Sequence, residues 1–565
     1  MANDNPFFYE SASELSPDLI KHYYTEGGNI TKVLFSHSNC YVQGERGAGK
    51  SMALRFHSHS VQKNNFQKNE FVGVYIPCSH PIMQKIEPSL YSEILMKPIS
   101  EHIFILPTLY HLVNSLSECD VLPSIPEQEE MLEQYSYMLS LDTPIVFYHN
   151  IFHSISLFAL RETNVVQQKM NSLHTENPTH LYTFYSLIIP LLDVLRSHEL
   201  FSSTHFSFMF DDAHMLPPLT RSILNSYVSY RDHSKFSFKV AIASGEDYDF
   251  STINKSILLQ GHDYALIDMQ EDFQATKSDF GKFVRKILKK RLELIDVFVD
   301  PDEYFPESES LKREIAVAEE MVRKEAIGKY GESETKKIND HVYKYGRAKY
   351  FRDRPGKASL PQYSGLNTLS HVSTGVIRNL LYPCWLMYEN ENRDNVRIVN
   401  KIRPQTQAEI LKDESDRLWA RIKEGYSNRI SGCSSQDSKM IDNLMQGLGD
   451  LLRQRLKDES CSEPRILSFI VSQKKSHDYD EVIRILNICR KAQLLFIRYG
   501  PSKDDGKREN YYTPNRLLWI TRGLDPEGQH GRLSLTASDL YGAMNGKPFT
   551  YNKQQGCIGT LFERK

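Results

Sequence analysis

A glycine-rich segment near the N-terminus limits the possible folds of this chain more than any other feature. It follows an apolar stretch, residues 39–43, that predicts a buried strand, and it leads into residues 51–57, which predict a helix start. The segment consists of Gly44, Glu45, Arg46, Gly47, Ala48, Gly49, Lys50 and Ser51. A Gly-x-x-x-x-Gly-Lys-Ser loop between a strand and a helix is typical of a phosphate-binding loop (P-loop).

The chemistry of a nucleoside triphosphate explains these residue types. Gly44, Gly47 and Gly49 permit a tight loop whose backbone N–H groups converge on phosphate oxygens at a helix N-terminus. Lys50 would place its ammonium between the β and γ phosphates, and the Ser51 hydroxyl would ligate Mg²⁺. Glu45, Arg46 and Ala48 complete the loop. We therefore predict that residues 44–51 bind ATP with Mg²⁺.

A second apolar run, residues 206–210, ends in the adjacent carboxylates Asp211 and Asp212. This pattern resembles a Walker B motif. Asp211 would hold Mg²⁺ through water, and Asp212 would act as the general base that deprotonates the attacking water. The alternative is a strand that ends in a solvated turn. Because Asp212 is one methylene shorter than the more usual Glu, we expect slow hydrolysis.

Two further polar residues are candidates for sensing the nucleotide. Ser244 directly follows the strand expected at 238–243, where it could contact the γ phosphate as a sensor 1; the alternative is an ordinary turn serine. Arg378 lies in residues 373–381, which predict a capped helix with one arginine on an apolar face. As a sensor 2, Arg378 would reach the phosphates from a helical lid. The alternative is an ion pair within the lid.

Strands alternating with helices predict an α/β fold with a parallel sheet. The expected strands are 39–43, 71–76, 206–210, 238–243 and 264–268. We predict a P-loop core over 1–300 with a helical insertion at about 80–200, a charged insertion and helical lid over 301–430, and a C-terminal domain over 431–565. In the last domain, helices at 438–457, 464–472 and 479–492 followed by strands at 494–499 and 511–512 predict a winged-helix-like α+β domain.

Composition excludes several classes of protein. The chain is 40% hydrophobic and 25% charged, and no apolar run approaches the ~20 residues that span a bilayer. The N-terminus has no secretory pattern, so we expect a cytoplasmic protein. Eight scattered cysteines without a Cys-x-x-Cys pair predict reduced, mostly buried thiols. No histidine cluster has metal-ligand spacing, which argues against a metal enzyme, a protease or a nuclease.

These motifs in this order resemble the AAA+ superfamily of ATPases. The string Asn5-Pro6-Phe7, the basic run 283–292 and the Arg378 helix sharpen the likeness toward bacterial ATPases similar to the origin-recognition-complex (ORC) initiators. The resemblance covers roughly residues 1–300 and 360–500. It implies ATP-dependent self-association and binding of duplex DNA.

The chain departs from that family where ring-forming members carry an arginine finger. Between Gly245 and Asp263 there is no arginine, only Lys255. Arg231 and Arg291 could substitute, although each is more simply a surface charge. This departure, together with Asp212, favours a slow switch over a fast motor.

Basic residues of the C-terminal domain could contact DNA phosphates, but acidic neighbours dilute them. The basic residues are Lys474, Lys475, Arg484, Arg490, Lys491, Lys503, Lys507 and Arg508. Two hypotheses remain open. The first is an ATPase that assembles on duplex DNA, and the second is a signalling ATPase that regulates an effector protein without binding DNA. Relatives of this kind occur in mobile elements and phage-defence operons.

Overall fold

The computed structural model describes the 565-residue chain except for residues 1–4, 9–10, 28–29, 63–70, 86–92, 172–179, 231–233, 247, 270–276, 355–358, 393–397, 473–475, 502–507, 530 and 550–565. The chain divides into two compact units. The P-loop unit is Glu10–Asp272, and the second unit combines Met1–Tyr9 with Phe273–Lys565. None of the helices in the described ranges has the length and apolar character of a membrane-spanning segment.

Five parallel strands form the sheet of the P-loop unit, in the order β2-β3-β4-β1-β5. They are β1 (Cys40–Gly44), β2 (Phe71–Pro77), β3 (His205–Asp211), β4 (Phe236–Ala243) and β5 (Ala265–Asp268). The α/β class and all five expected strands are confirmed. Every residue of β3 and β4 is buried, as in parallel strands covered on both faces, which explains their continuous apolar runs.

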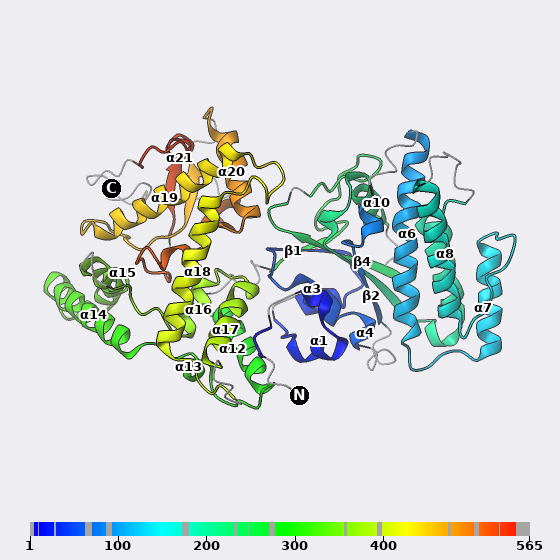
Figure 1. Cartoon of the computed structure of the whole chain (residues 1–565), viewed down its shortest axis with the longest axis horizontal. Coiled ribbons are helices and arrows are strands. Elements are labelled where there is room, and N and C mark those ends of the chain that lie inside the picture. Colours follow the sequence, from blue (N-terminus) through cyan, green and yellow to red (C-terminus); the bar gives the residue numbers. More distant parts are fainter. Residues whose placement is uncertain are drawn as a thin grey trace. The chain divides into compact units, whose positions relative to one another are not determined.

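Helices precede and connect these strands (Figure 1). They are α1 (Pro17–Tyr23), α2 (Ile30–Leu34), α3 (Lys50–Phe56), α4 (His59–Gln62), α6 (Glu93–Ser117), α7 (Ile125–Met138), α8 (Ile151–Asn171), α9 (Ile189–Ser197) and α10 (Pro218–Val228). The expected helical insertion lies between β2 and β3, where α6 packs against β2 and α8 packs on α6. Helix α7 contacts α8 and α9 on the side away from the sheet.

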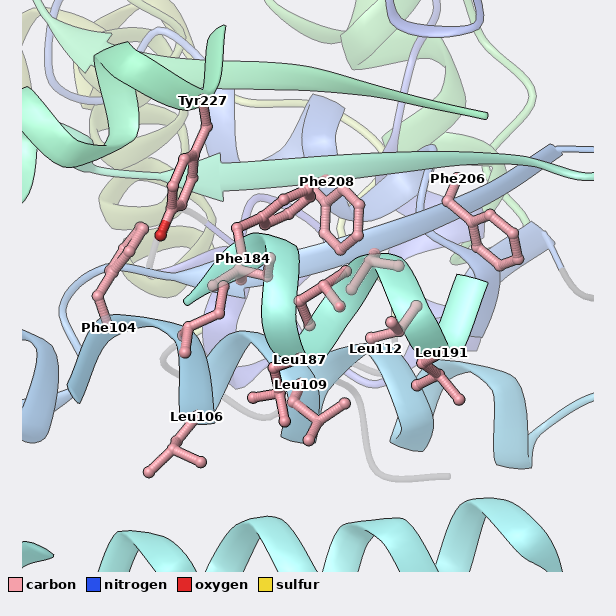
Figure 2. Packing of buried hydrophobic residues seen from close by; sticks show 14 of the residues in the cluster. Phe104, Leu106, Leu109, Leu112, Phe184, Leu187, Leu191, Phe206, Phe208 and Tyr227 are labelled. Carbon is pink, nitrogen blue, oxygen red and sulfur yellow. The ribbon is translucent and has the colours of Figure 1, made fainter. Parts of the chain in front are cut away.

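Aromatic and leucine side chains fill the space between β3 and the insertion (Figure 2). The Phe184 ring lies 4.9 Å from that of Tyr227 and 5.7 Å from that of Phe208, measured between ring centroids. The Phe104 ring of α6 lies 5.3 Å from that of Phe210 on β3. These contacts fix α6 against the strand that ends in the two carboxylates.

The second unit contains helices and a four-stranded mixed sheet in the order β7-β8-β6-β9. Its elements are α12 (Lys277–Glu293), α13 (Pro301–Tyr304), α14 (Glu309–Tyr330), α15 (Thr335–Asp353), α16 (Leu366–Val372), α17 (Ile377–Glu391), α18 (Pro404–Glu424), α19 (Ser435–Lys457), β6 (Phe469–Ser472), α20 (Tyr479–Lys491), β7 (Leu495–Pro501), β8 (Arg508–Pro514), β9 (Leu533–Thr536) and α21 (Ala537–Met544). The expected β7–β8 hairpin is confirmed.

The N-terminal residues belong to the core of the second unit. Phe7 is fully buried, with ring centroids 6.1 Å from Tyr304, 5.6 Å from Phe305 and 6.2 Å from Tyr388. The Asn5 side-chain amide donates 2.9 Å hydrogen bonds to the Trp385 carbonyl and the Glu389 carboxylate. The string Asn5-Pro6-Phe7 therefore packs against residues that come much later in the sequence.

The structure differs from expectation at residues 464–472. They do not form a helix, because Phe469 and Val471 alternate inward as residues of strand β6. The P-loop unit ends at Asp272, and α12, which follows it, packs against α13 and α16. The segment around 425–438 connects α18 to α19 within the second unit. The domain bounds at 300 and 430 stay predictions.

A buried ion cluster organises the second unit. The Asp525 carboxylate, 2% exposed, accepts hydrogen bonds from the Arg347 guanidinium at 3.1 and 3.2 Å and from Arg465 at 2.7 Å. Arg465 also donates to the carbonyl oxygens of Tyr343 and Gly528. The two guanidinium groups hold the pKa of Asp525 below its usual value despite its burial. The cluster joins α15 to the segments around residues 465 and 525.

Candidate functional site

The carboxyl ends of β1, β3 and β4 bring the predicted P-loop and acidic residues to one edge of the sheet. In the strand register, Gly44 lies beside Ala243, so Ser244 follows directly after the strand next to the P-loop. The Ser244 backbone N–H donates to the Gly44 carbonyl at 3.0 Å. In α/β sheets, ligands bind beyond the carboxyl ends of the strands where strand order reverses, and β1 lies at that position.

The loop from β1 to α3 has the backbone of a phosphate cradle. Gly47 and Gly49 adopt φ angles of 87° and 100°, in the left-handed region that other residues rarely enter. Gly49 is the N-cap of α3, so the first N–H groups of that helix face the loop. Each of these two glycines is therefore required by the loop geometry.

Lys50 is the first residue of α3 and is 5% exposed. Its ammonium donates to the carbonyl oxygens of Gly44 at 2.8 Å and Glu45 at 3.1 Å. Burial lowers the pKa of Lys50, while the nearby carboxylates of Asp212 and Asp211 oppose that shift. The carboxylates thus favour the charged ammonium inside the loop.

Asp211 and Ser51, the two expected Mg²⁺ ligands, are in contact. Asp211 is 3% exposed, and its carboxylate accepts hydrogen bonds from the Tyr75 hydroxyl at 2.8 Å and the Asp212 N–H at 3.0 Å. Burial and then the charge of Asp212 raise the pKa of Asp211, and hydrogen bonds from Ser51 and Tyr75 lower it. A hydroxyl and a carboxylate meeting beside a P-loop are oxygen ligands of the kind that Mg²⁺ prefers.

Asp212 differs from Asp211 in both backbone and exposure. It adopts φ 53° and ψ 39°, a left-handed conformation uncommon for a residue with a side chain. Its side chain is 40% exposed, and one carboxylate oxygen lies 4.0 Å from Nδ1 of His214. An exposed carboxylate next to a buried one can meet a water molecule, as a general base must.

The side-chain oxygen of Ser244 is a further polar atom at this site. Its Oγ is buried and has no hydrogen-bond partner among the described residues. A buried hydroxyl without a partner costs free energy, so it indicates a place where a ligand oxygen would bind. Together with the contact between Ser51 and Asp211, this atom makes the predicted residues fit a nucleotide phosphate with Mg²⁺.

Two further residues at this site, Tyr75 and His214, were not predicted from the sequence. Tyr75, on β2, donates to Asp211, and the Arg55 guanidinium lies 5.7 Å from the Tyr75 ring centroid. His214 is 6% exposed and its Nδ1 accepts from the Ala243 N–H at 3.4 Å. Burial lowers the pKa of His214, against the charge of Asp212. Tyr75 is the one residue with a polar tip in an otherwise apolar strand, which is the only hint that the sequence contains.

The remaining candidates belong to other segments of the chain. Arg378 is exposed on the first turn of α17, in the second unit, so its sensor 2 role stays a prediction. Arg291 is not a surface charge: it is 3% exposed and donates to the Pro6 carbonyl at 3.3 Å. Lys255 occupies a turn with φ 60°, and Arg231 lies outside the described residues.

The basic residues expected to contact DNA are only partly described. Arg484 on α20 binds the carboxylates of Asp437 at 2.5 Å and Glu481 at 2.8 Å. These bonds raise the pKa of Arg484 and occupy its guanidinium. The side chains of Lys474, Lys475, Lys503, Lys507 and Arg508 lie outside the described residues.

The family model described as ORC-CDC6-like matches residues 5–326 and 312–535. The chain belongs to the ORC-CDC6-like family. This assignment confirms the AAA+ P-loop ATPase resemblance. No curated protein matches the ORC-CDC6-like chain. Similar solved structures are Cdc6p from Pyrobaculum aerophilum, with 11% identity over 92% of this chain and 99% of that chain (TM-score 0.31), and Aeropyrum pernix Orc1 in complex with DNA, with 9% identity over 86% of each chain (TM-score 0.27).

Proposed function

We propose that this ORC-CDC6-like chain binds ATP with Mg²⁺, hydrolyses it slowly, and acts as a nucleotide-dependent switch that self-associates and engages duplex DNA. The observation that carries the proposal is the meeting of Ser51, Asp211 and Lys50 at one edge of the sheet, next to the unpartnered Ser244 hydroxyl. Nothing else in the described P-loop unit combines a phosphate cradle with oxygen ligands.

The chain's own residues divide the chemical work. The backbone N–H groups after Gly47 and the Lys50 ammonium bind and orient phosphate oxygens. Ser51 and Asp211 would hold the cation, which would supply charge neutralisation at the phosphates. Asp212 orients a water molecule and accepts its proton, and Ser244 donates from the end of β4. Arg378 would complete the site from the lid as a sensor 2.

Two features support slow turnover. The Asp212 side chain reaches one methylene less far than Glu, so the base stands farther from the water. The amino-acid sequence between Gly245 and Asp263 contains no arginine that could act as an arginine finger in the ATP site of a neighbouring copy. An arginine in that role accelerates phosphoryl transfer by ~10³–10⁵ in related chemistry.

Single-turnover and steady-state ATPase assays test the proposal. Wild-type protein is expected to bind ATP and to turn over slowly, with stimulation by duplex DNA. Lys50→Ala should lose ATP binding, whereas Asp212→Asn should bind ATP and lose hydrolysis. Arg46→Ala is a matched loop control, because its side chain is 60% exposed and pairs with Glu246. Retained ATP binding in Lys50→Ala would refute the assignment of the site.

A signalling ATPase that regulates an effector protein through the second unit, without DNA, is the second candidate. The ion pairs of Arg484 with Asp437 and Glu481 favour this second candidate, because they engage one of the side chains that was expected to contact DNA phosphates. A salt titration of DNA binding separates the two, since phosphate contacts weaken steeply as salt rises. Affinity that does not respond to salt supports the signalling ATPase. A setting in phage defence or a mobile element is part of the first proposal, the switch that engages DNA, and the identity of neighbouring genes tests it.

A further inference from the structure

The helical insertion of the P-loop unit has an extreme charge pattern. Residues 98–160 contain eight acidic residues and no Lys or Arg. With 68 Lys and Arg in 565 residues, a stretch of this length would contain about eight at random. The acidic residues gather around α7, where Glu127, Glu129, Glu130 and Glu133 lie. The absence of Lys and Arg therefore extends over the whole of residues 98–160 and does not depend on a single position.

Helix α7 presents these acids on its outer face. Its inner face buries Met131, Leu132 and Tyr135, and the Tyr135 hydroxyl donates to the Leu187 carbonyl at 3.0 Å. Glu129, Glu130 and Glu133 are exposed. None of these three has an ion-pair partner in the part of the chain that the structure describes, so no described cation neutralises their charge.

Apolar side chains continue this face at the C-terminal end of α7. Tyr137 is 85% exposed, Met138 51% and Val146 56%. Val146 lies next to α7 because the Ile145 N–H donates to the Ser136 hydroxyl at 3.0 Å. Tyr137 stands one helical turn after Glu133, so the acidic and apolar groups are neighbours. Exposed aromatic and Met side chains gathered together mark interaction sites.

We propose that the α7 surface, formed by Glu129, Glu130, Glu133, Tyr137, Met138 and Val146, is the docking site for a basic, amphipathic segment of a partner protein. Charge complementarity selects this occupant. Nucleic acid and anionic membranes are repelled by the glutamates, whereas Lys or Arg side chains would pair with them. Tyr137 and Met138 would receive the apolar residues of the same segment, since a central aromatic contact contributes most of the affinity at such interfaces.

A fluorescence-anisotropy titration of the full chain tests the proposal. The probe is a labelled synthetic helix-forming peptide with leucines on one face and lysines on the other. The triple variant Glu129→Gln, Glu130→Gln, Glu133→Gln should weaken peptide binding at least ten-fold, and Tyr137→Ser with Met138→Ser should weaken it comparably. The control variant Glu320→Gln, Glu325→Gln, Glu332→Gln removes the same charge from exposed positions on and beside α14 and should leave binding unchanged.

Each other outcome overturns the proposal. Equal weakening in the control variant would show a general charge effect. Loss of self-association in the triple Gln variant, measured by sedimentation velocity without peptide, would show that the occupant is a second copy of this chain. Tighter duplex DNA binding by that variant with no change in peptide binding would show that α7 only repels DNA. Lys50→Ala should bind the peptide like wild type, which separates this docking site from the ATP site.

Discussion

Replacing Tyr75 by Phe removes one oxygen atom and tests how Asp211, the proposed cation ligand, is held in place. The Asp211 carboxylate is 3% exposed and has three hydrogen bonds, from the Tyr75 hydroxyl at 2.8 Å, from the Asp212 N–H at 3.0 Å and from Ser51. A hydrogen bond to a charged group contributes about 1.5–3 kcal/mol, and water cannot easily replace this one. The Phe ring fits the same space, so no cavity forms.

Two measurements follow from that magnitude. The free energy of unfolding, from urea denaturation followed by far-UV circular dichroism, should fall by about 1.5–3 kcal/mol in Tyr75→Phe. Because 1.4 kcal/mol is a factor of ten, ATP affinity in Mg²⁺ should fall by up to roughly ten- to 150-fold, while ATP affinity in EDTA stays the same.

Tyr137→Phe is the matched control, because it makes the same chemical change on a side chain that is 85% exposed. It should alter neither quantity. The reasoning fails if Tyr75→Phe loses ATP affinity equally in Mg²⁺ and EDTA, since Tyr75 would then support the loop and not the cation ligand. It also fails if neither stability nor affinity changes.

Three further outcomes are expected. Burial lowers the pKa of His57, His102 and His111 to about 4 and that of His205 to about 3. Unfolding therefore takes up protons as pH falls from 6.5 to 4, and each histidine lowers the free energy of unfolding of the P-loop unit by up to about 3 kcal/mol. Helix content should fall before the fluorescence of the three tryptophans changes, because all three lie in the second unit, and simultaneous changes would contradict this expectation. Asp525→Asn should destabilise the second unit by about 3–5 kcal/mol in urea, because it leaves the buried Arg465 guanidinium without its carboxylate. It also removes one of the two carboxylates that pair with Arg347, which keeps Glu527. Asp416→Asn at an exposed pair should cost under about 1 kcal/mol. Gly73→Ala should lower the free energy of unfolding by about 1–3 kcal/mol, since the added Cβ would lie 2.3 Å from the His57 carbonyl oxygen. Gly281→Ala, in helix α12, is the control. Its added Cβ would meet nothing within 4 Å, so the melting temperature should stay the same or rise.

The sheet and the P-loop were predictable because their signals are local. Apolar runs define β3 and β4, and the glycine spacing places Lys50 and Ser51 at the start of α3. The segment 464–472 was predicted wrongly because short apolar runs fit helix and strand alike, and pairing with β9 decides between them.

The residues that surround the site depend on contacts that no local pattern records. Tyr75 reaches Asp211 only because β2 pairs with β3, 136 positions apart in sequence. His214 meets Ala243 only because β4 follows β3 in the sheet. The return of Phe7 to a core formed by residues beyond 300 likewise has no sequence signature.

The burial of Phe7 has a practical consequence for dissecting this molecule. The P-loop unit is one continuous piece of chain, but the second unit is made of two pieces that come together only after 272 residues have been synthesised. A fragment starting at 273 would lack the Phe7 ring, and losing a buried Phe costs about 3–5 kcal/mol. A short peptide carrying Asn5-Pro6-Phe7, supplied separately, should therefore restore that fragment by complementation.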